Sequence, residues 1–436
     1  MSRPINFFKG HPTRNLLPVQ QVADSYNKVL LGSDYLAYDI DPLNQHPLSY
    51  GTDPGNYDVR KTISDWTNEK FKHNLSQPEN VNLTAGASYG IANILVSTTD
   101  PSTVTKQAFI VSPTYFLINS VFIDTGFEGK LTAIKETPGA EYEIDLEHLE
   151  QKLKYHSLGL QDGEGKEINI IKDPIRGQRK LYRFVIYMVP TFSNPGGISY
   201  SVATREKLIQ LARKYDLLII SDDVYEFLDY TDRDVPLPRF NYLDQVTLPP
   251  YKKFGNTISN ATFSKIIAPG LRVGWQETPT PALVEQLAVT GANKSGGTPG
   301  QLASLVIQDL IKTGQIESIL EVFKTAYKSR AQTVLFSAQK YLPPSAVVFG
   351  GDGGYFLWVK IPGDIDHNQV ITVLQEKYKV VLASGDHFEV EGDKQGWGKN
   401  NVRVCISFLT EEEIEAGFRA WGSVLQELYP QLYTTN

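Results

Sequence analysis

Lys265 is the residue of this chain with the clearest chemical potential. It lies in the segment Phe263–Arg272, at the end of a predicted strand, and is followed by a short turn and then Arg272. A primary amine at the end of a strand can form an imine with an aldehyde cofactor, and the arginine can bind that cofactor's phosphate. A solvated loop lysine is the common alternative. The assignment therefore depends on the other residues around it.

A second segment has the properties of a phosphate site. The small residues of Thr84–Gly90 follow a short predicted strand at Asn80–Leu83 and open a predicted helix. Such a turn directs free backbone N–H groups and the positive end of the helix dipole toward an anion. The alternative is that its glycines only let helix and strand pack closely. We expect the phosphate contacts at Gly86, Ala87 and Ser88.

Two predicted buried strands, 184–189 and 217–220, end in polar residues. The first leads to Asn194, whose amide could donate to a phenolic oxygen, although Asn-Pro-Gly is also a strong turn signal. The second leads to Asp222 at its carboxyl end, where ligands bind in doubly wound sheets. A carboxylate there can keep a pyridine nitrogen protonated, and Tyr225 could bond the phenolic oxygen. The acidic pair at 222–223 could otherwise be a metal site or a helix cap.

In this order along the chain, the segments resemble the class I and II aminotransferases, pyridoxal-phosphate enzymes of fold type I. The nearest subgroup holds 2-aminoadipate, kynurenine and aromatic aminotransferases. The resemblance extends from Ile5 to the end of the chain. It also includes the following motifs: Ile5-Asn6-Phe7, Leu48-Ser49-Tyr50-Gly51, Ser112-Pro113-Thr114-Tyr115, Gly353-Gly354-Tyr355-Phe356 and Asn401-Val402-Arg403.

The resemblance implies a role for each site residue. Lys265 would form the imine with pyridoxal 5′-phosphate, Asp222 would pair with the pyridine nitrogen, and Tyr115 would stack on the ring. Asn194 and Tyr225 would hold the phenolic oxygen. The phosphate would be bound by these residues: Gly86, Ala87, Ser88, Thr262 or Ser264, and Arg272.

Substrate contacts and assembly follow from the same resemblance. Arg403 would form a bidentate pair with the substrate α-carboxylate, with Asn194 beside the substrate. Tyr50 would reach the phosphate of the other subunit, which implies a homodimer. Arg14, in the arm before the first domain, is a candidate for the distal carboxylate of an acidic substrate. Amino acids and 2-oxo acids are the expected small-molecule partners.

The pattern of elements predicts an α/β fold with a large, doubly wound, mostly parallel sheet and a smaller α+β domain. Residues 1–50 form an N-terminal arm that completes the small domain, 51–305 the large cofactor domain, and 306–436 the small C-terminal domain. Two stretches depart from the family pattern. Residues 151–180 are a predicted surface insertion, and 228–260 is a predicted long loop of the kind that is often functional.

Composition agrees with this assignment. The chain has 436 residues, 41% of them hydrophobic, and a net charge of −7, which argues against nucleic acid as a partner. One cysteine, Cys405, cannot form an intramolecular disulfide, so we expect a reducing compartment and the cytoplasm. We find no secretory core and no apolar run long enough to span a membrane. The seven histidines lack metal-ligand spacing, so we predict no metal site.

Three functions are compatible with these residues. The first is transfer of an amino group from a large amino acid of the 2-aminoadipate, kynurenine or aromatic type to a 2-oxo acid such as 2-oxoglutarate. The second is a C–S β-lyase or decarboxylase on the same scaffold, because the cofactor's carbanion chemistry is shared. The third is a ligand-sensing module. Such regulators carry an N-terminal helix-turn-helix domain, and only a short arm precedes the family match here, which disfavours it.

Overall fold

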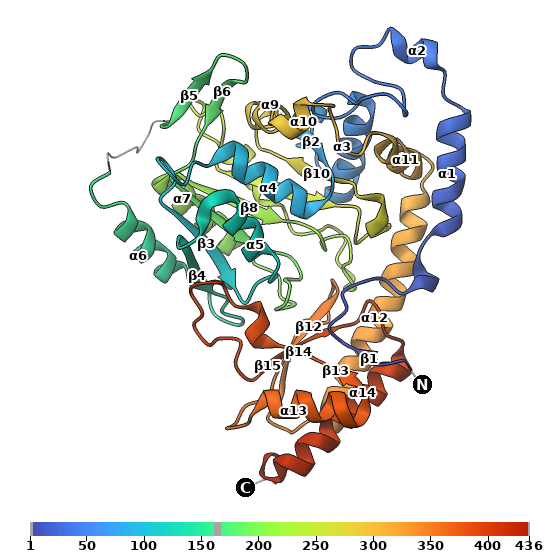
Figure 1. Ribbon diagram of the computed structural model, residues 1–436, viewed down its shortest axis with the longest axis vertical. Helices are drawn as coiled ribbons and strands as arrows, with labels where there is room; N and C mark the ends of the chain where they lie inside the picture. The colour runs from blue at the N-terminus through green and yellow to red at the C-terminus, as the bar shows by residue number, and fades with distance from the viewer. Residues whose placement is uncertain (1–2, 161–166, 435–436) are drawn as a thin grey trace.

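A computed structural model of the protein describes residues 3–160 and 167–434 (Figure 1). The expected segment Gln161–Lys166 of the surface insertion lies outside the described residues. Each helix in the described part of the chain is too short or too polar to span a lipid bilayer.

The centre of the protein is a seven-stranded sheet in the order β2-β10-β9-β8-β7-β3-β4. β10 runs antiparallel to both of its neighbours, and all other pairs are parallel. The inner strands are buried along their whole length because helices cover both faces. The strands are β2 (Val81–Thr84), β3 (Gln107–Ser112), β4 (Leu131–Lys135), β7 (Phe184–Met188), β8 (Leu217–Asp222), β9 (Thr257–Thr262) and β10 (Gly274–Glu277).

Helices lie between these strands in the chain and provide the crossover connections that a parallel sheet needs. Ser201 caps one of them, α7, by accepting from the Thr204 N–H, and thereby fixes where the chain leaves the turn after β7. The helices around the large sheet are α3 (Tyr57–Phe71), α4 (Ala87–Thr98), α5 (Ile118–Phe122), α6 (Leu146–His156), α7 (Val202–Tyr215), α8 (Phe240–Thr247), α9 (Pro281–Ala288) and α10 (Gly291–Lys294).

The C-terminal part forms a second, four-stranded antiparallel sheet in the order β11-β12-β15-β14. Its strands are β11 (Val347–Phe349), β12 (Phe356–Lys360), β14 (Ala383–Ser384) and β15 (Asn401–Cys405). The helices of this part are α11 (Gln301–Lys312), α12 (Gln315–Tyr341), α13 (His367–Val373) and α14 (Glu411–Leu428). The long helix α12 runs from the large sheet down to this smaller one (Figure 1). The two sheets confirm the predicted fold class.

The N-terminal arm belongs structurally to the C-terminal part. Strand β1 (Ile5–Asn6) pairs in parallel with β13 (Val380–Val381), and Figure 1 shows the N-terminus beside α14. After the arm, α1 (Val19–Leu31) packs on α11, and α2 (Tyr35–Asp39) follows at the far end. The N-terminal arm and the C-terminal part, which are distant in sequence, thereby lie together at one edge of the large sheet.

Three sequence expectations about chain organisation need correction. The stretch 228–260 is not one loop, because it contains α8 and the start of β9, whose side chains are largely buried. Residues 151–156 are the end of α6, and a hairpin of β5 (Ile170–Asp173) and β6 (Gly177–Lys180) closes the insertion. The expected boundary at residue 305 falls inside α11.

Candidate active site

A cavity of about 500 Å³ lies where the carboxyl ends of the large sheet's strands face the arm, β12 and β15. Most of the residues that the sequence predicts for the site line it. They are Ala87, Ser88, Tyr115, Asn194, Asp222, Tyr225, Thr262, Ser264, Lys265, Arg272 and Arg403. The structure therefore brings together groups that are more than three hundred positions apart in the chain, such as Ala87 and Arg403.

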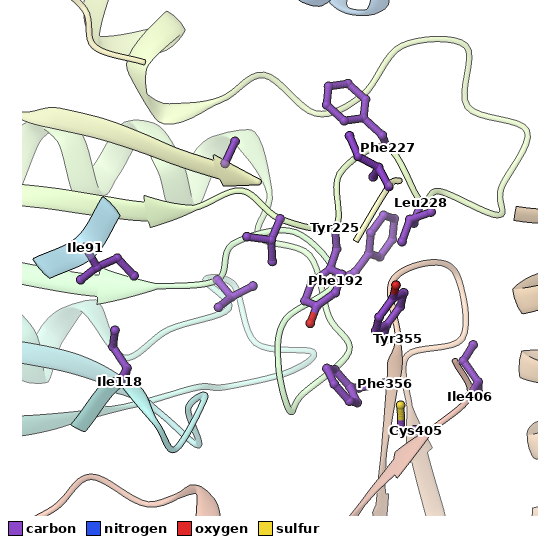
Figure 2. Close-up of a cluster of buried hydrophobic side chains, with 14 of the residues drawn as sticks. Ile91, Ile118, Phe192, Tyr225, Phe227, Leu228, Tyr355, Phe356, Cys405 and Ile406 are labelled. Carbon is purple, nitrogen blue, oxygen red and sulfur yellow. The ribbon is translucent and has the colours of Figure 1, made fainter. Parts of the chain in front are cut away.

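Lys265 follows the end of β9 and is held by the second sheet. The Tyr355 hydroxyl donates to the Lys265 carbonyl at 3.1 Å, and the Lys265 ammonium lies 5.2 Å from the centre of the Tyr355 ring. Figure 2 shows Tyr355 and Phe356 packed close to Tyr225, which comes from the loop after β8. Burial lowers the pKa of Lys265, and the Arg403 and Arg272 cations act in the same direction. The deprotonated, nucleophilic form of the amine is therefore more accessible than it would be in water.

Asp222 is the last residue of β8 and is buried in the floor of the cavity. Its two oxygens accept from the Tyr187 hydroxyl at 2.8 Å and from the Asn260 amide at 2.9 Å. Burial raises its pKa to about 6, and the two hydrogen bonds oppose that rise. A carboxylate fixed in this way would be stabilised by a cationic ligand group such as a protonated ring nitrogen.

The predicted phosphate turn has the geometry of an anion site. Gly86 is the N-cap of α4 with φ of 96°, a conformation suited to glycine, and a Cβ there would lie 2.8 Å from a guanidinium nitrogen of Arg272. That guanidinium donates to the Ala85 carbonyl at 3.0 Å, so it is held over the start of α4. Thr262 and Ser264 hydroxyls lie 3.0 Å apart on the facing turn. These groups fit a phosphate, and Lys265 and Asp222 fit the remainder of pyridoxal phosphate.

Arg403 projects from β15 into the cavity and is almost fully buried. It donates to the Asn194 side-chain oxygen at 2.9 Å and to the Phe8 carbonyl at 2.8 Å, while its Nε has no hydrogen-bond partner. Three aromatic rings surround it, the nearest being Phe356 at 4.1 Å. Within the described residues it has no carboxylate partner, so an anionic ligand would satisfy it.

Three predicted site residues do not line this cavity. Tyr50 is 82% exposed and packs beside Gly296. Arg14 lines a neighbouring cavity of the arm instead. Gly86 directly precedes Ala87, which lines the cavity, and a Cβ at Gly86 would meet the Arg272 guanidinium. Within a single chain, Tyr50 and Arg14 therefore lie outside the cavity that the other predicted site residues line.

Sequence reasoning missed several residues of the cavity. Asn260 pairs with Asp222 across β9 and β8, and an asparagine in a buried strand next to that position was the available signal. The sequence places Tyr187 in an apolar strand and does not indicate its hydrogen bond to Asp222. Phe8, Lys9 and His11 line the cavity from the arm, and no local pattern indicates that they do.

Known proteins resemble this chain along almost its whole length. An uncharacterized protein of Saccharomyces cerevisiae is 43% identical over 434 residues, covering 97% of both chains. The 2-aminoadipate transaminase of Thermus thermophilus is 22% identical and covers 97% of this chain and 90% of its own. A solved kynurenine aminotransferase of Pyrococcus horikoshii has a TM-score of 0.77 at 23% identity, over 98% of this chain and 92% of that one.

The family described as aminotransferase class I and II matches residues 40–420. This match accounts for the amine, the carboxylate and the anion-binding turn that meet in the cavity. It confirms the expected family, enzyme class and cofactor. The chain belongs to the aminotransferase class I and II family and is an enzyme that depends on pyridoxal phosphate.

Proposed function

We propose that the enzyme transfers the amino group of a large amino acid, of the 2-aminoadipate, kynurenine or aromatic type, to a 2-oxo acid such as 2-oxoglutarate. The observation that carries this is Arg403, a buried cation in the cavity with no carboxylate partner within the described residues. Amino acids and 2-oxo acids share an α-carboxylate, so one fixed guanidinium can bind both substrates. The activities named for the Thermus and Pyrococcus relatives support the substrate class.

Different residues around the cavity would bind different parts of the cofactor. Gly86, Ala87, Ser88, Thr262 or Ser264, and Arg272 would hold the phosphate, and Asp222 the ring nitrogen. Tyr115 would stack on the ring. Asn194 accepts from Arg403 through its oxygen, which leaves its amide free to donate to the phenolic oxygen together with Tyr225. When bound, pyridoxal phosphate supplies an electron sink for charge at the substrate α-carbon.

Lys265 is the group that moves the proton. Its Nζ would take the proton from the substrate α-carbon as a general base and return it as a general acid. Burial lowers its pKa, which keeps more of the amine in the basic form near neutral pH. Arg403 orients the substrate by its α-carboxylate, so that the α-hydrogen faces the amine.

The wall opposite the sheet suits a large side chain. Phe8 and Phe116 lie 5.8 Å apart between ring centres, and both line the cavity. These rings offer apolar surface to an aromatic or long aliphatic substrate. The sequence assigns a distal carboxylate to Arg14, which lies in the adjoining cavity.

We also infer a homodimer, in which Tyr50 reaches the cofactor phosphate of the partner subunit. The segment before the large sheet exposes many large apolar side chains, a composition typical of a protein interface. They are Val19, Leu31, Leu36, Ile40 and Leu48, each at least 70% exposed. Cys405 is a free, buried thiol, which is compatible with the reducing cytoplasm.

A substrate panel tests the function. We expect purified enzyme with pyridoxal phosphate to convert its cofactor to the amine form with 2-aminoadipate, kynurenine or an aromatic amino acid, and 2-oxoglutarate to reverse the spectral change. Release of ammonia, sulfide or carbon dioxide instead would favour the lyase or decarboxylase. If no amino acid changes the spectrum, the proposal is wrong.

Arg403→Ala gives the proposal a second test. Leaving a substrate carboxylate without its buried partner should lower kcat/KM for every substrate, by roughly 3 kcal/mol or more of transition-state stabilisation. Arg419→Ala is the matched control, because Arg419 is exposed on α14, away from the cavity. Unchanged turnover in the Arg403 variant would contradict the assignment of the α-carboxylate site.

A further inference from the structure

Lys9 is a cation of the active-site cavity to which the proposed function assigns no role. Within the described residues, the lysines and arginines that line this cavity are Lys9, Lys265, Arg272 and Arg403. The other three bind the cofactor or the α-carboxylate. The Lys9 ammonium lies 4.1 Å from the centre of the Phe408 ring, and none of the ion pairs of the described residues includes it. Lys9 is therefore available to a ligand.

A second cavity, of about 480 Å³, adjoins the first at Lys9. Arg3, Lys9 and Arg14 line it together with uncharged residues and the Phe408 ring. Arg3 is paired with Glu413 at 2.6 Å, whereas Lys9 and Arg14 are in no ion pair of the described residues. No acidic side chain lines this second cavity. Lys9 borders both cavities, so an anionic group that extends from the active site would meet positive charge there.

The arm holds Lys9 at a defined position relative to Arg403. The Asn6 side-chain oxygen accepts from the backbone N–H groups of Phe8 at 2.9 Å and of Lys9 at 3.1 Å. Arg403 donates to the Phe8 carbonyl at 2.8 Å. The guanidinium that would bind the α-carboxylate is thus bonded directly to the residue before Lys9.

The charges near the arm favour a ligand with more than one negative charge. Asp222 is the acidic residue among those that line the active-site cavity, and it lies on the sheet side. On the arm side, burial lowers the pKa of His11, and the Lys265 and Lys9 cations lower it further. The pKa of His11 is thus lowered mainly by burial, and the neighbouring lysines contribute a further positive potential. An incoming carboxylate would reduce that potential.

We propose that Lys9 binds the distal carboxylate of dicarboxylic substrates, with Arg14 adding positive potential from the second cavity. This inference rests on the proposed function and moves the direct contact from Arg14, which the sequence suggested, to Lys9. The Phe408 ring gives the ammonium a favourable position when the substrate side chain is apolar. One pocket could then accept an aromatic donor and a dicarboxylic acceptor in turn.

The test compares two acceptors of matched shape in the complete, cofactor-loaded enzyme. They are 2-oxoglutarate and 5-methyl-2-oxohexanoate, in which two methyl groups replace the distal carboxylate oxygens. The ratio of their kcat/KM values should fall roughly 10- to 100-fold in Lys9→Met, because a charge-assisted hydrogen bond is lost. Lys9→Arg should retain most of the ratio, and Arg14→Met should lower it less than Lys9→Met does.

Lys207→Met is the control, because Lys207 is exposed on α7, away from both cavities. The ratio of kcat/KM values for the two acceptors should be the same in this variant as in the unaltered enzyme. A ratio within twofold of the unaltered enzyme in Lys9→Met would overturn the proposal. So would a larger loss in Arg14→Met than in Lys9→Met. An unaltered enzyme that transaminates neither acceptor with any donor would instead overturn the proposed function, and the role of Lys9 with it.

Discussion

Single residues of the site obtain their chemistry from burial. Lys265 has a lowered pKa and Asp222 a pKa raised to about 6, in each case mainly because a charge is taken out of water. Burial also lowers the pKa of Arg403. An amine that loses its proton more easily can attack an aldehyde. A guanidinium that has no carboxylate partner among the described residues can bind a ligand that brings negative charge.

Glu136 is a buried carboxyl group outside the cavity, beneath the turn that carries Asn194. Burial raises its pKa to about 7, although hydrogen bonds from Ser193 and Tyr200 oppose the rise. The Tyr200 hydroxyl lies 3.1 Å from one of its oxygens, and a Cβ at Gly196 would overlap the other. The protonation state of Glu136 therefore affects the packing of this turn.

We predict that Glu136 makes stability depend on pH. Its pKa in the folded protein is above the unfolded value, so the folded state favours the protonated form. That stabilisation is complete below the ordinary pKa of 4.5 and is lost as pH rises through about 7. Glu136→Gln, which cannot ionise, should remove a fall of roughly 2–3 kcal/mol in unfolding free energy between pH 5 and pH 8. Urea denaturation of both proteins across this range measures the difference.

Glu206→Gln provides the control for that experiment, because Glu206 is an exposed carboxylate on α7. It should leave the pH dependence of the unaltered protein in place. If Glu136→Gln shows the same slope as the unaltered protein, the buried carboxyl does not control stability in this range.

At the scale of elements, the start of α14 joins the arm to the C-terminal part. Thr410 and Glu413 form a capping box, in which the Thr410 hydroxyl accepts from the Glu413 N–H at 3.3 Å and Glu413 accepts from the Thr410 N–H at 3.0 Å. The other oxygen of Glu413 binds Arg3 of the arm. The cap therefore stabilises the helix and orients Glu413, which binds Arg3 of the arm.

Thr410→Ala should destabilise the protein by about 1 kcal/mol, because the N–H of Glu413 loses its partner. Thr410→Ser keeps the hydroxyl and should destabilise the protein by only about a few tenths of a kcal/mol. Chemical denaturation monitored by circular dichroism measures both variants. Equal stability of the alanine and serine variants would show that the capping hydrogen bond contributes nothing.

At the scale of the whole molecule, the exposed apolar surface before the large sheet favours the proposed dimer. If Tyr50 reaches the partner's cofactor phosphate, Tyr50→Phe should weaken cofactor retention by about 1 kcal/mol or somewhat more, because a hydrogen bond to a charged acceptor is lost. Dialysis followed by measurement of bound cofactor tests this. Sedimentation should show a dimer for both proteins, and a fully active monomer would contradict the shared site.

Local patterns in the sequence were sufficient to predict most of the elements. The buried strands β7 and β8 contain continuous apolar runs, and Asn194 and Asp222 follow them at the carboxyl end, where parallel strands place ligands. Lys265 follows β9, whose sequence is largely polar, and was indicated instead by the turn and Arg272 after it. The roles of these three residues remain predictions. The stretch 228–260 was misjudged because its prolines indicated a loop, while burial under the sheet stabilises α8.

Which distant residues face one another depends on how the elements pack in three dimensions. The contact between Phe8 and Arg403 joins positions 395 apart, and no periodicity in either segment predicts it. The same applies to Lys9 at the junction of two cavities and to Glu136, whose pKa depends on burial by residues from other elements. A local pattern specifies a backbone conformation, but burial and charge at a side chain are set by everything that packs around it.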